Sequence, residues 1–515
     1  MTAHKHIGKI VGVLMAAAVA FCLIVTLFAD RLVAVSGSSA ATMEYESTLF
    51  DTSEIMTVNI IMDEDQWQEL LDNAISEEYY ACDVEINGET ISNVGIRAKG
   101  NTSLSSIAND PDTDRYSFKI KFDKYVDGQT CMGLDKLVLN NNFADATNRK
   151  EALVYDMFQY LGADASLYNY AKISVNGEYW GTYLALEAVE DSFKLRNYGV
   201  SDGKLYKPET MGMGNDQKEE GSNLMDRPER PQGDFDQADM DEKFRNPQGG
   251  HDDFGSFGNR NGGADLNYVD DDADSYSTIW DGADGKVTDS DKERVVTAIK
   301  NINEGTDLTT YLDVDNILKY MAVHEFVVNL DSLSGNMAHN FYLYENDGQL
   351  NIIPWDYNLS FGGMTNGGMG GGPGRESTES SGATSMINDP IDTPFDGTDF
   401  FDALLENEEY LAQYHEYLRQ LAEEYVQGGR LQEVWERLDA QTDELIETDP
   451  TAFYTAAEYE EAKDTLWTVL QLRAESVLGQ LDGTIPSTDD GQQNAQDTLI
   501  DGSAIDLSVM GEFNH

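Results

Sequence analysis

The hydrophobic pattern of this chain changes from strand-like alternation in its first half to helical periodicity toward its C-terminus. Phe118, Ile120 and Phe122 alternate with polar residues, as expected of a half-buried strand. Asn-Gly pairs at 87–88 and 176–177 each separate two strand-like runs and predict β-hairpins. Residues 400–481 instead carry apolar residues at helical spacing. This order predicts an α+β fold with a β-rich N-terminal lobe and a mainly helical C-terminal lobe.

One long helix is expected inside the β-rich half, between residues 145 and 162. Val154, Phe158 and Leu161 share one face of this helix, and Gly162 is placed to end it. The hairpin of residues 171–186 follows and leads into Glu187, which we expect to join the two lobes.

Composition divides the chain into segments. Residues 209–274 are rich in Gly, Asp, Asn, Met and Pro with few aliphatic residues, which is typical of a disordered or loosely packed acidic insertion. A second glycine-rich loop is expected at 362–385. The expected boundaries are 1–34 for an apolar segment with its flanks, 35–54 for a linker, 55–208 for the N-terminal lobe, 209–274 for the insertion, 275–482 for the C-terminal lobe and 483–515 for a disordered tail.

Residues 10–29 are twenty consecutive uncharged, mostly apolar residues with lysines before them. A helix of this length spans about 30 Å, which matches the hydrocarbon core of a bilayer. The segment is therefore either a signal anchor that holds the protein in the membrane or a long signal peptide cleaved near residues 36–41. Both interpretations place the bulk of the chain outside the cytoplasm, either on the cell membrane with an extracellular catalytic domain or secreted.

The chain is strongly acidic, with 34 Lys+Arg against 94 Asp+Glu and a formal net charge of −60. A surface of this charge repels phosphate backbones, which argues against a nucleic-acid-binding protein. In so acidic a chain, a cluster of basic residues calls for a functional explanation.

Two strand-like segments carry four cations. Arg97 and Lys99 are two residues apart, as are Lys119 and Lys121, so each pair lies on one face of its strand. If the two strands pair, the four side chains form one cationic face, which predicts an anionic ligand. A solvated strand face is the alternative.

The segment after Lys99 consists of small polar residues, Gly100, Asn101, Thr102 and Ser103. Backbone N–H groups and hydroxyls of such a loop can surround a phosphate. An ordinary hairpin turn beside a basic strand would use the same residue types.

Three oxygen-bearing side chains stand out in the second half. Asp331 and Asn340 bracket a polar loop, and Asp356 follows a short apolar strand. Carboxylate and amide oxygens are the ligands that Mg²⁺ prefers. Each residue alone could cap a turn, but the ordered set predicts a site for a divalent cation.

The sequence offers little support for a disulfide scaffold, a zinc site or a serine nucleophile. Cys82 and Cys131 are the only possible disulfide pair outside the apolar N-terminal run, too few for a disulfide scaffold or a structural zinc site. His324 and His339 are isolated, and no serine lies in a nucleophile-elbow context.

Six segments, taken in order, resemble the CotH kinase family, the spore coat protein H-like atypical protein kinases. The resemblance extends over roughly residues 57–362, excluding the acidic insertion. It implies a divergent two-lobed protein-kinase-like fold that transfers phosphate from ATP to Ser or Thr of a protein substrate, with Mg²⁺ as cofactor and Mn²⁺ as an alternative. The segments are Val94–Ser103, Tyr116–Phe122, Asp145–Gly162, Val175–Glu187, Asp331–Asn340 and Pro354–Gly362.

The resemblance also implies roles for residues around the nucleotide. Lys119 or Lys121 occupies the strand position of the phosphate-pairing lysine, and the sequence leaves both open. Arg149 matches a family position near the phosphates, and Glu187 lies where the lobes join and the nucleotide base would dock. The loop that covers the phosphates corresponds to Lys99, Gly100, Asn101, Thr102 and Ser103.

In the second half, Asp331 resembles the catalytic aspartate, and Asn340 and Asp356 resemble the metal-binding pair. Phosphoryl transfer needs cations around the γ-phosphate, a metal held by oxygen ligands and an aspartate that aligns the attacking hydroxyl. The sequence supplies each of these in the order that a kinase requires.

Two other functions compete with a protein kinase acting on surface or spore-coat proteins. One is a non-catalytic adhesin or coat protein built on the same scaffold, and the other is transfer to a glycan acceptor. Retention of Asp331, Asn340 and Asp356 together favours catalysis, because a binding scaffold need not keep a metal site.

Overall fold

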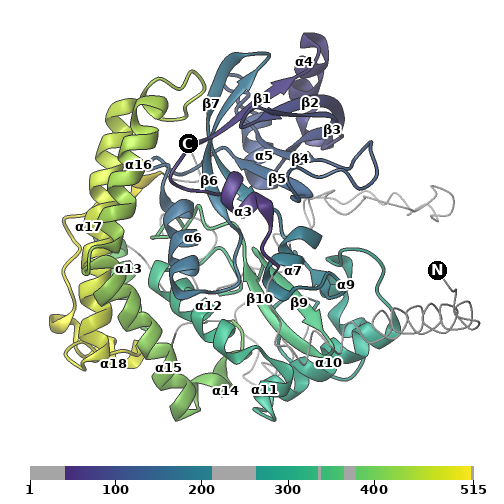
Figure 1. Ribbon diagram of the computed structural model, residues 1–515. Coiled ribbons are helices and arrows are strands. Elements are labelled where there is room, and N and C mark those ends of the chain that lie inside the picture. The colour runs from purple at the N-terminus through teal and green to yellow at the C-terminus, as the bar shows by residue number, and fades with distance from the viewer. Residues whose placement is uncertain are drawn as a thin grey trace, which may run out of the picture.

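The computed structural model describes residues 41–210, 262–334, 338–364, 379–393, 395 and 397–511 (Figure 1). The apolar segment at 10–29 and most of the predicted insertion lie outside these residues, so both expectations stay predictions. Within the described ranges, no helix is both long enough and apolar enough to cross a membrane.

The first half of the chain forms a closed seven-stranded barrel, in the order β1-β2-β3-β4-β5-β7-β6. Neighbouring strands are antiparallel except β1 and β6, whose parallel pairing closes the barrel. Both Asn-Gly hairpins are confirmed: Asn87, Gly88, Asn176 and Gly177 all have positive φ, as a type I′ turn requires. The strands are β1 (Met56–Ile61), β2 (Tyr80–Ile86), β3 (Glu89–Lys99), β4 (Ser117–Lys121), β5 (Lys136–Asn140), β6 (Tyr168–Val175) and β7 (Glu178–Glu187).

The predicted alternation in the fourth strand is confirmed. Phe118, Ile120 and the following Phe122 are fully buried in the barrel interior, where Phe118 packs against Trp67 of α4 (Glu64–Asp72) with ring centroids 5.4 Å apart. The side chains between them, Lys119 and Lys121, are partly exposed and lie on the opposite face of the strand. This pattern fixes which face of β3 and β4 can carry a binding site.

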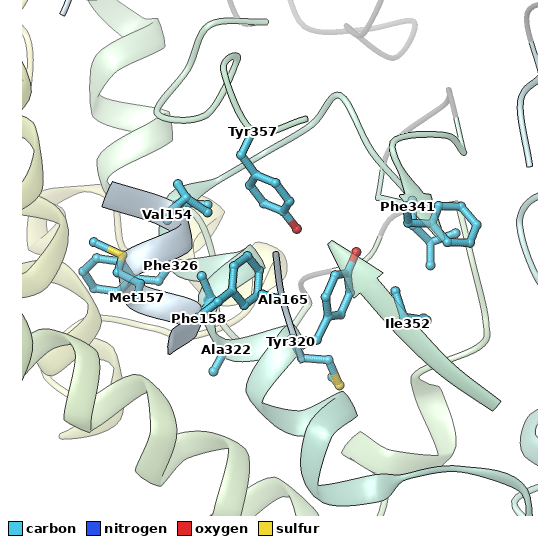
Figure 2. Close-up of a cluster of buried hydrophobic side chains, with 14 of the residues drawn as sticks. Val154, Met157, Phe158, Ala165, Tyr320, Ala322, Phe326, Phe341, Ile352 and Tyr357 are labelled. Atoms are coloured by element: carbon cyan, nitrogen blue, oxygen red, sulfur yellow. The ribbon is translucent and has the colours of Figure 1, made fainter. Parts of the chain in front are cut away.

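The predicted long helix is α6 (Lys150–Leu161), and Gly162 ends it in the left-handed conformation with φ 69°. It lies between the outside of the barrel and the helical region (Figure 1). Nearly all of its residues are buried, because it packs on both. Figure 2 shows Val154, Met157 and Phe158 of α6 beside Tyr320 and Phe326 of α12 and Tyr357.

The second half is mainly helical and contains one three-stranded sheet, in the order β10-β9-β8. The protein is therefore a mixed α+β structure with a β-rich N-terminal region and a helical C-terminal region, as predicted. The strands of this sheet are β8 (Lys204–Tyr206), β9 (Phe341–Asn346) and β10 (Gln349–Pro354). The other α-helices within the described residues are α3 (Glu44–Thr48), α4 (Glu64–Asp72), α5 (Thr102–Ala108), α7 (Asp191–Tyr198), α9 (Ser277–Asp281), α10 (Asp289–Asn303), α11 (Leu308–Tyr311), α12 (Val314–Val327), α13 (Glu379–Ile387), α14 (Asp402–Leu405), α15 (Glu408–Arg419), α16 (Arg430–Glu447), α17 (Ala456–Leu481) and α18 (Asp489–Asn494).

The C-terminal segment differs from the predicted disordered tail. Residues 484–511 include α18 and a 3₁₀ turn, Leu507–Met510, in which Leu507 is 6% and Met510 0% exposed. The backbone N–H of Ala146 donates to the Met510 carbonyl at 3.1 Å. The segment has few apolar residues, which suggested disorder, but the ones it has insert into the large helical core.

Three smaller expectations also change. The predicted linker contains Tyr45, which is fully buried, and the end of the predicted insertion contains Leu266, also fully buried. Residues 379–385 of the predicted glycine-rich loop belong to α13, while residues 365–378 lie outside the described ranges. Cys82 and Cys131 are both buried free thiols.

Candidate active site

The β9–β10 hairpin brings two of the predicted metal ligands to one end. Phe341 pairs with Pro354, so Asn340, just before β9, and Asp356, just after β10, flank the same end of the hairpin. Both residues have left-handed backbone conformations, with φ of 58° and 60°. Such conformations are uncommon outside glycine and cluster at functional sites.

Asp331 is held beside this end of the hairpin by its neighbours in the loop. Asn340 Nδ2 donates to the Asp331 backbone carbonyl at 2.8 Å and to Asp331 Oδ2 at 3.1 Å. His339 Nε2 lies 2.8 Å from Asp331 Oδ1. Both carboxylate oxygens of Asp331 are therefore oriented, and the residue is directly linked to a predicted metal ligand.

On the barrel side, three side chains from three elements form a hydrogen-bonded series. Lys99 Nζ, at the end of β3, donates to Asn140 Oδ1 at 2.9 Å, at the end of β5. Asn140 Nδ2 then donates to Glu151 Oε2 of α6 at 2.8 Å. The Lys99 ammonium also lies 5.9 Å from the ring centroid of Trp355, the residue before Asp356. Lys99 thus connects the barrel to the segment that carries Asp356.

The two halves of the site meet at Glu151 and Asp356. Burial and the nearby Asp356 carboxylate raise the pKa of Glu151 to about 8. Glu151 Oε1 is buried and accepts no hydrogen bond from the described residues. Two close carboxylates with an unsatisfied oxygen suit a bound cation, which would balance their charge.

No group of three or more His, Cys, Asp or Glu side chains in the described ranges is arranged to hold a metal by itself. Mg²⁺ is commonly held by one or two protein oxygens together with substrate phosphates and water. Asp356 and Asn340 fit that kind of site.

The four predicted cations do share one outer face of the barrel. Arg97 pairs directly with Lys119 across β3 and β4, and Gly95 pairs with Lys121. Of these four side chains, that of Lys99 donates the hydrogen bond to Asn140 described above. Arg97 Nη1 instead lies 2.8 Å from Glu77 Oε1, and Lys121 Nζ lies 3.9 Å from Asp123 Oδ1.

The loop after Lys99 is shorter than expected. Gly100 has φ 131°, a conformation that favours glycine, and Asn101 is the cap of α5, so Thr102 and Ser103 already belong to that short helix. These residues remain next to Lys99, and their assignment to the phosphates stays a prediction.

The structure places Arg149 and Glu187 in other surroundings. The Arg149 guanidinium contacts Asp439 and Asp443 of α16, at 2.6 and 2.9 Å. The fully buried Glu187 carboxylate accepts hydrogen bonds from Tyr45, Arg196 and the Leu167 backbone. Neither side chain joins the Lys99–Asn140–Glu151 series. Arg149 Nε and Nη1 are buried without a hydrogen-bond partner among the described residues, and the assignments of Arg149 and Glu187 to the nucleotide stay predictions.

Sequence reasoning missed Asn140 and Glu151. Asn140 opens a run of three asparagines, and Glu151 is one acidic residue among 94 Asp+Glu, so neither stands out as a pattern. Their importance depends on contacts between β3, β5 and α6 that only the fold creates.

A family model described as CotH kinase protein matches residues 96–477, which is most of the chain. The chain belongs to the CotH kinase family. The match begins in β3, just before Lys99, and ends in α17, so it includes every site residue described above. No curated protein matches this CotH-family chain.

Proposed function

We propose that this CotH-family protein is a phosphotransferase with a two-lobed, kinase-like active site. It would transfer the γ-phosphate of ATP to a Ser or Thr hydroxyl of a surface or spore-coat protein. The observation that carries the proposal is the meeting of the Lys99–Asn140–Glu151 series with Asp356, at the hairpin end where Asn340 binds Asp331.

Each residue has a role that its contacts support. Lys99 presents a cation to the nucleotide phosphates, and Asn140 and Glu151 orient it. Asp356 and Asn340 would hold Mg²⁺ or Mn²⁺, which neutralises charge on the phosphates. Asp331, fixed by Asn340 and His339, would accept a hydrogen bond from the acceptor hydroxyl and align it for attack.

The protein acceptor and the location are parts of the same proposal. The apolar segment at 10–29, as an anchor or a signal peptide, would place the catalytic domain outside the cytoplasm. Accessible acceptors would then be surface or coat proteins.

Incubation of the purified full chain with γ-labelled ATP, Mg²⁺ or Mn²⁺ and candidate acceptors tests the proposal. We expect metal-dependent label on Ser or Thr, lost in Asp356→Asn. Label on a glycan would change the acceptor class. A chain that binds no nucleotide and transfers no phosphate would indicate a non-catalytic adhesin or coat scaffold.

A further inference from the structure

We propose that Asp439 and Asp443 of α16 are positioning residues, which act through Arg149 to hold α6 so that Glu151 faces Asp356. This inference rests on the proposed function, because Glu151 belongs to the proposed site.

The contacts form a compact cluster around a buried guanidinium. Arg149 Nη2 donates to Asp443 Oδ1 at 2.9 Å and to the Tyr459 hydroxyl at 2.8 Å, and lies 2.6 Å from Asp439 Oδ1. Lys463 Nζ also donates to Asp443 Oδ2 at 3.1 Å. The Arg149 side chain is fully buried, whereas those of Asp439 and Asp443 are 39% and 28% exposed.

The local sequence of α6 does not explain an arginine at this place. Arg149 occupies the cap position, where Ser, Thr, Asp and Asn are preferred, and its side chain makes no capping hydrogen bond. Arg149 also puts a cation at the positive end of the helix dipole, which is unfavourable. Asp145 lies beside the neighbouring Lys150 and accepts from its backbone N–H at 3.0 Å, but it forms no hydrogen bond or ion pair with the Arg149 guanidinium. The carboxylates of α16 offset this arrangement, because they neutralise a charge that would otherwise be buried without a partner.

The cluster lies where a small movement changes the active site. Glu151 is two residues after Arg149, so a shift of the first turn of α6 moves the Glu151 carboxylate away from Asn140 and Asp356. A second attachment lies less than two turns further along α6, where Asp156 accepts hydrogen bonds from Arg430 and Tyr425. Two attachments along one helix fix both its position and its rotation.

The helix that provides the carboxylates also contacts the barrel. α16 packs against β7, and the Tyr179 hydroxyl of β7 donates to the Leu445 carbonyl of α16 at 2.9 Å (Figure 1). α16 therefore touches both the barrel, which carries Lys99, and the helix that carries Glu151. α16 is thus placed to hold α6 relative to the barrel.

The test compares the full-length Asp439→Asn/Asp443→Asn variant with the wild type. Hydrogen exchange of the amides of residues 150–156 is measured without nucleotide, and kcat and KM for ATP are measured with Mg²⁺. We expect about tenfold faster exchange in this segment and about a tenfold lower kcat, with a smaller change in KM, because alignment rather than nucleotide contact is lost.

Two further variants serve as controls. Glu444→Gln removes an exposed carboxylate on the same helix that makes no ion pair within the described residues, and it should match the wild type in both measurements. Asp443→Glu keeps the charge and should retain most of the turnover. If the double variant does not fold, Asp439→Asn alone, at the more exposed position, should give the same two effects at a smaller size.

Unchanged exchange in residues 150–156 would overturn the proposal, and so would faster exchange with unchanged kcat. An equal effect of Glu444→Gln would also overturn it, because the loss would then follow net charge on α16. If the wild type transfers no phosphate, the proposed function fails, and exchange alone decides whether the carboxylates anchor α6.

Discussion

Lys99 and Glu151 are joined by the side chain of Asn140, which accepts from the ammonium at 2.9 Å and donates to the carboxyl group at 2.8 Å. Protein kinases in general orient their phosphate-pairing lysine, whose strand position the sequence assigns here to Lys119 or Lys121, with a direct ion pair to a glutamate. An amide bridge orients Lys99 without neutralising it. In the proposed function, the charge of Lys99 then attracts the nucleotide phosphates, in a protein whose net charge of −60 repels them.

Replacement of Lys99 by methionine should weaken ATP binding far more than adenosine binding. Loss of one charge-assisted contact is worth on the order of 1.5–3 kcal/mol, or roughly ten- to a hundredfold in affinity. Titration calorimetry with ATP and adenosine measures the difference.

Arg97→Gln is the matched comparison, because Arg97 shares the outer face but contacts Glu77. It should lower stability, by leaving the buried Glu77 carboxylate without its partner, and change ATP affinity little. Equal loss of ATP affinity in both variants would mean that the whole face binds phosphate. Wild-type affinity in Lys99→Met would place the phosphate site elsewhere.

Asp356→Asn should abolish phosphotransfer and leave the fold intact. Asparagine keeps the size of the side chain and tolerates the left-handed backbone of this position, so the substitution removes the charge without adding strain. Incorporation of labelled phosphate and a thermal melt are measured on the same preparation.

Asp347→Asn is a closely matched control for that experiment. Asp347 has φ 51° and lies in the turn at the opposite end of the same β9–β10 hairpin. The control should transfer phosphate like the wild type. Substantial turnover in Asp356→Asn would contradict its role as a metal ligand.

The sequence predicted the parts of this fold that depend on local patterns. The Asn-Gly hairpins, the alternation around Phe118 and the helix ended by Gly162 are all set by neighbouring residues, and all three appear as expected. The order of Asp331, Asn340 and Asp356 was also readable, because a short hairpin brings its two ends together.

The parts that the sequence does not reveal depend on contacts between distant segments. The assignment of Arg149 to the phosphates stays a prediction, but no local pattern predicts its ion pairs with Asp439 and Asp443, some 290 residues later in the chain. Asn140 and Glu151 likewise become part of the candidate site only because α6 lies against β5, where the two side chains form a hydrogen bond. A single sequence contains no local signal for such pairs.

The C-terminal segment gives a stability prediction that follows from its packing. Met510 is fully buried, so Met510→Ala should lower the free energy of unfolding by about 2–5 kcal/mol. Val509→Ala, at a partly exposed neighbour, should cost clearly less. Urea denaturation of both variants measures this, and equal, negligible losses would show that the segment does not contribute to the core.

The stability of the protein should depend on pH through Asp135, which precedes β5 and accepts hydrogen bonds from the Ser192 backbone and hydroxyl at 2.9 and 2.6 Å. Burial raises the pKa of Asp135 to about 6, although the Ser192 hydrogen bonds lower it, and the nearby Glu190 carboxylate adds to the rise. Between about pH 4 and pH 6 the folded protein therefore holds more protons at this site than the unfolded chain.

The contribution of Asp135 to stability is thus complete below about pH 4 and is lost as the pH rises through about 6. Asparagine resembles the neutral acid in shape, so Asp135→Asn should remove this dependence. The free energy of unfolding of the wild type, relative to Asp135→Asn, should fall by on the order of 2 kcal/mol between pH 4 and pH 7. Urea denaturation at each pH gives the difference and cancels the contributions of the other carboxylates. A constant difference, or one that grows with pH, would show that Asp135 is ionised in the folded protein throughout this range.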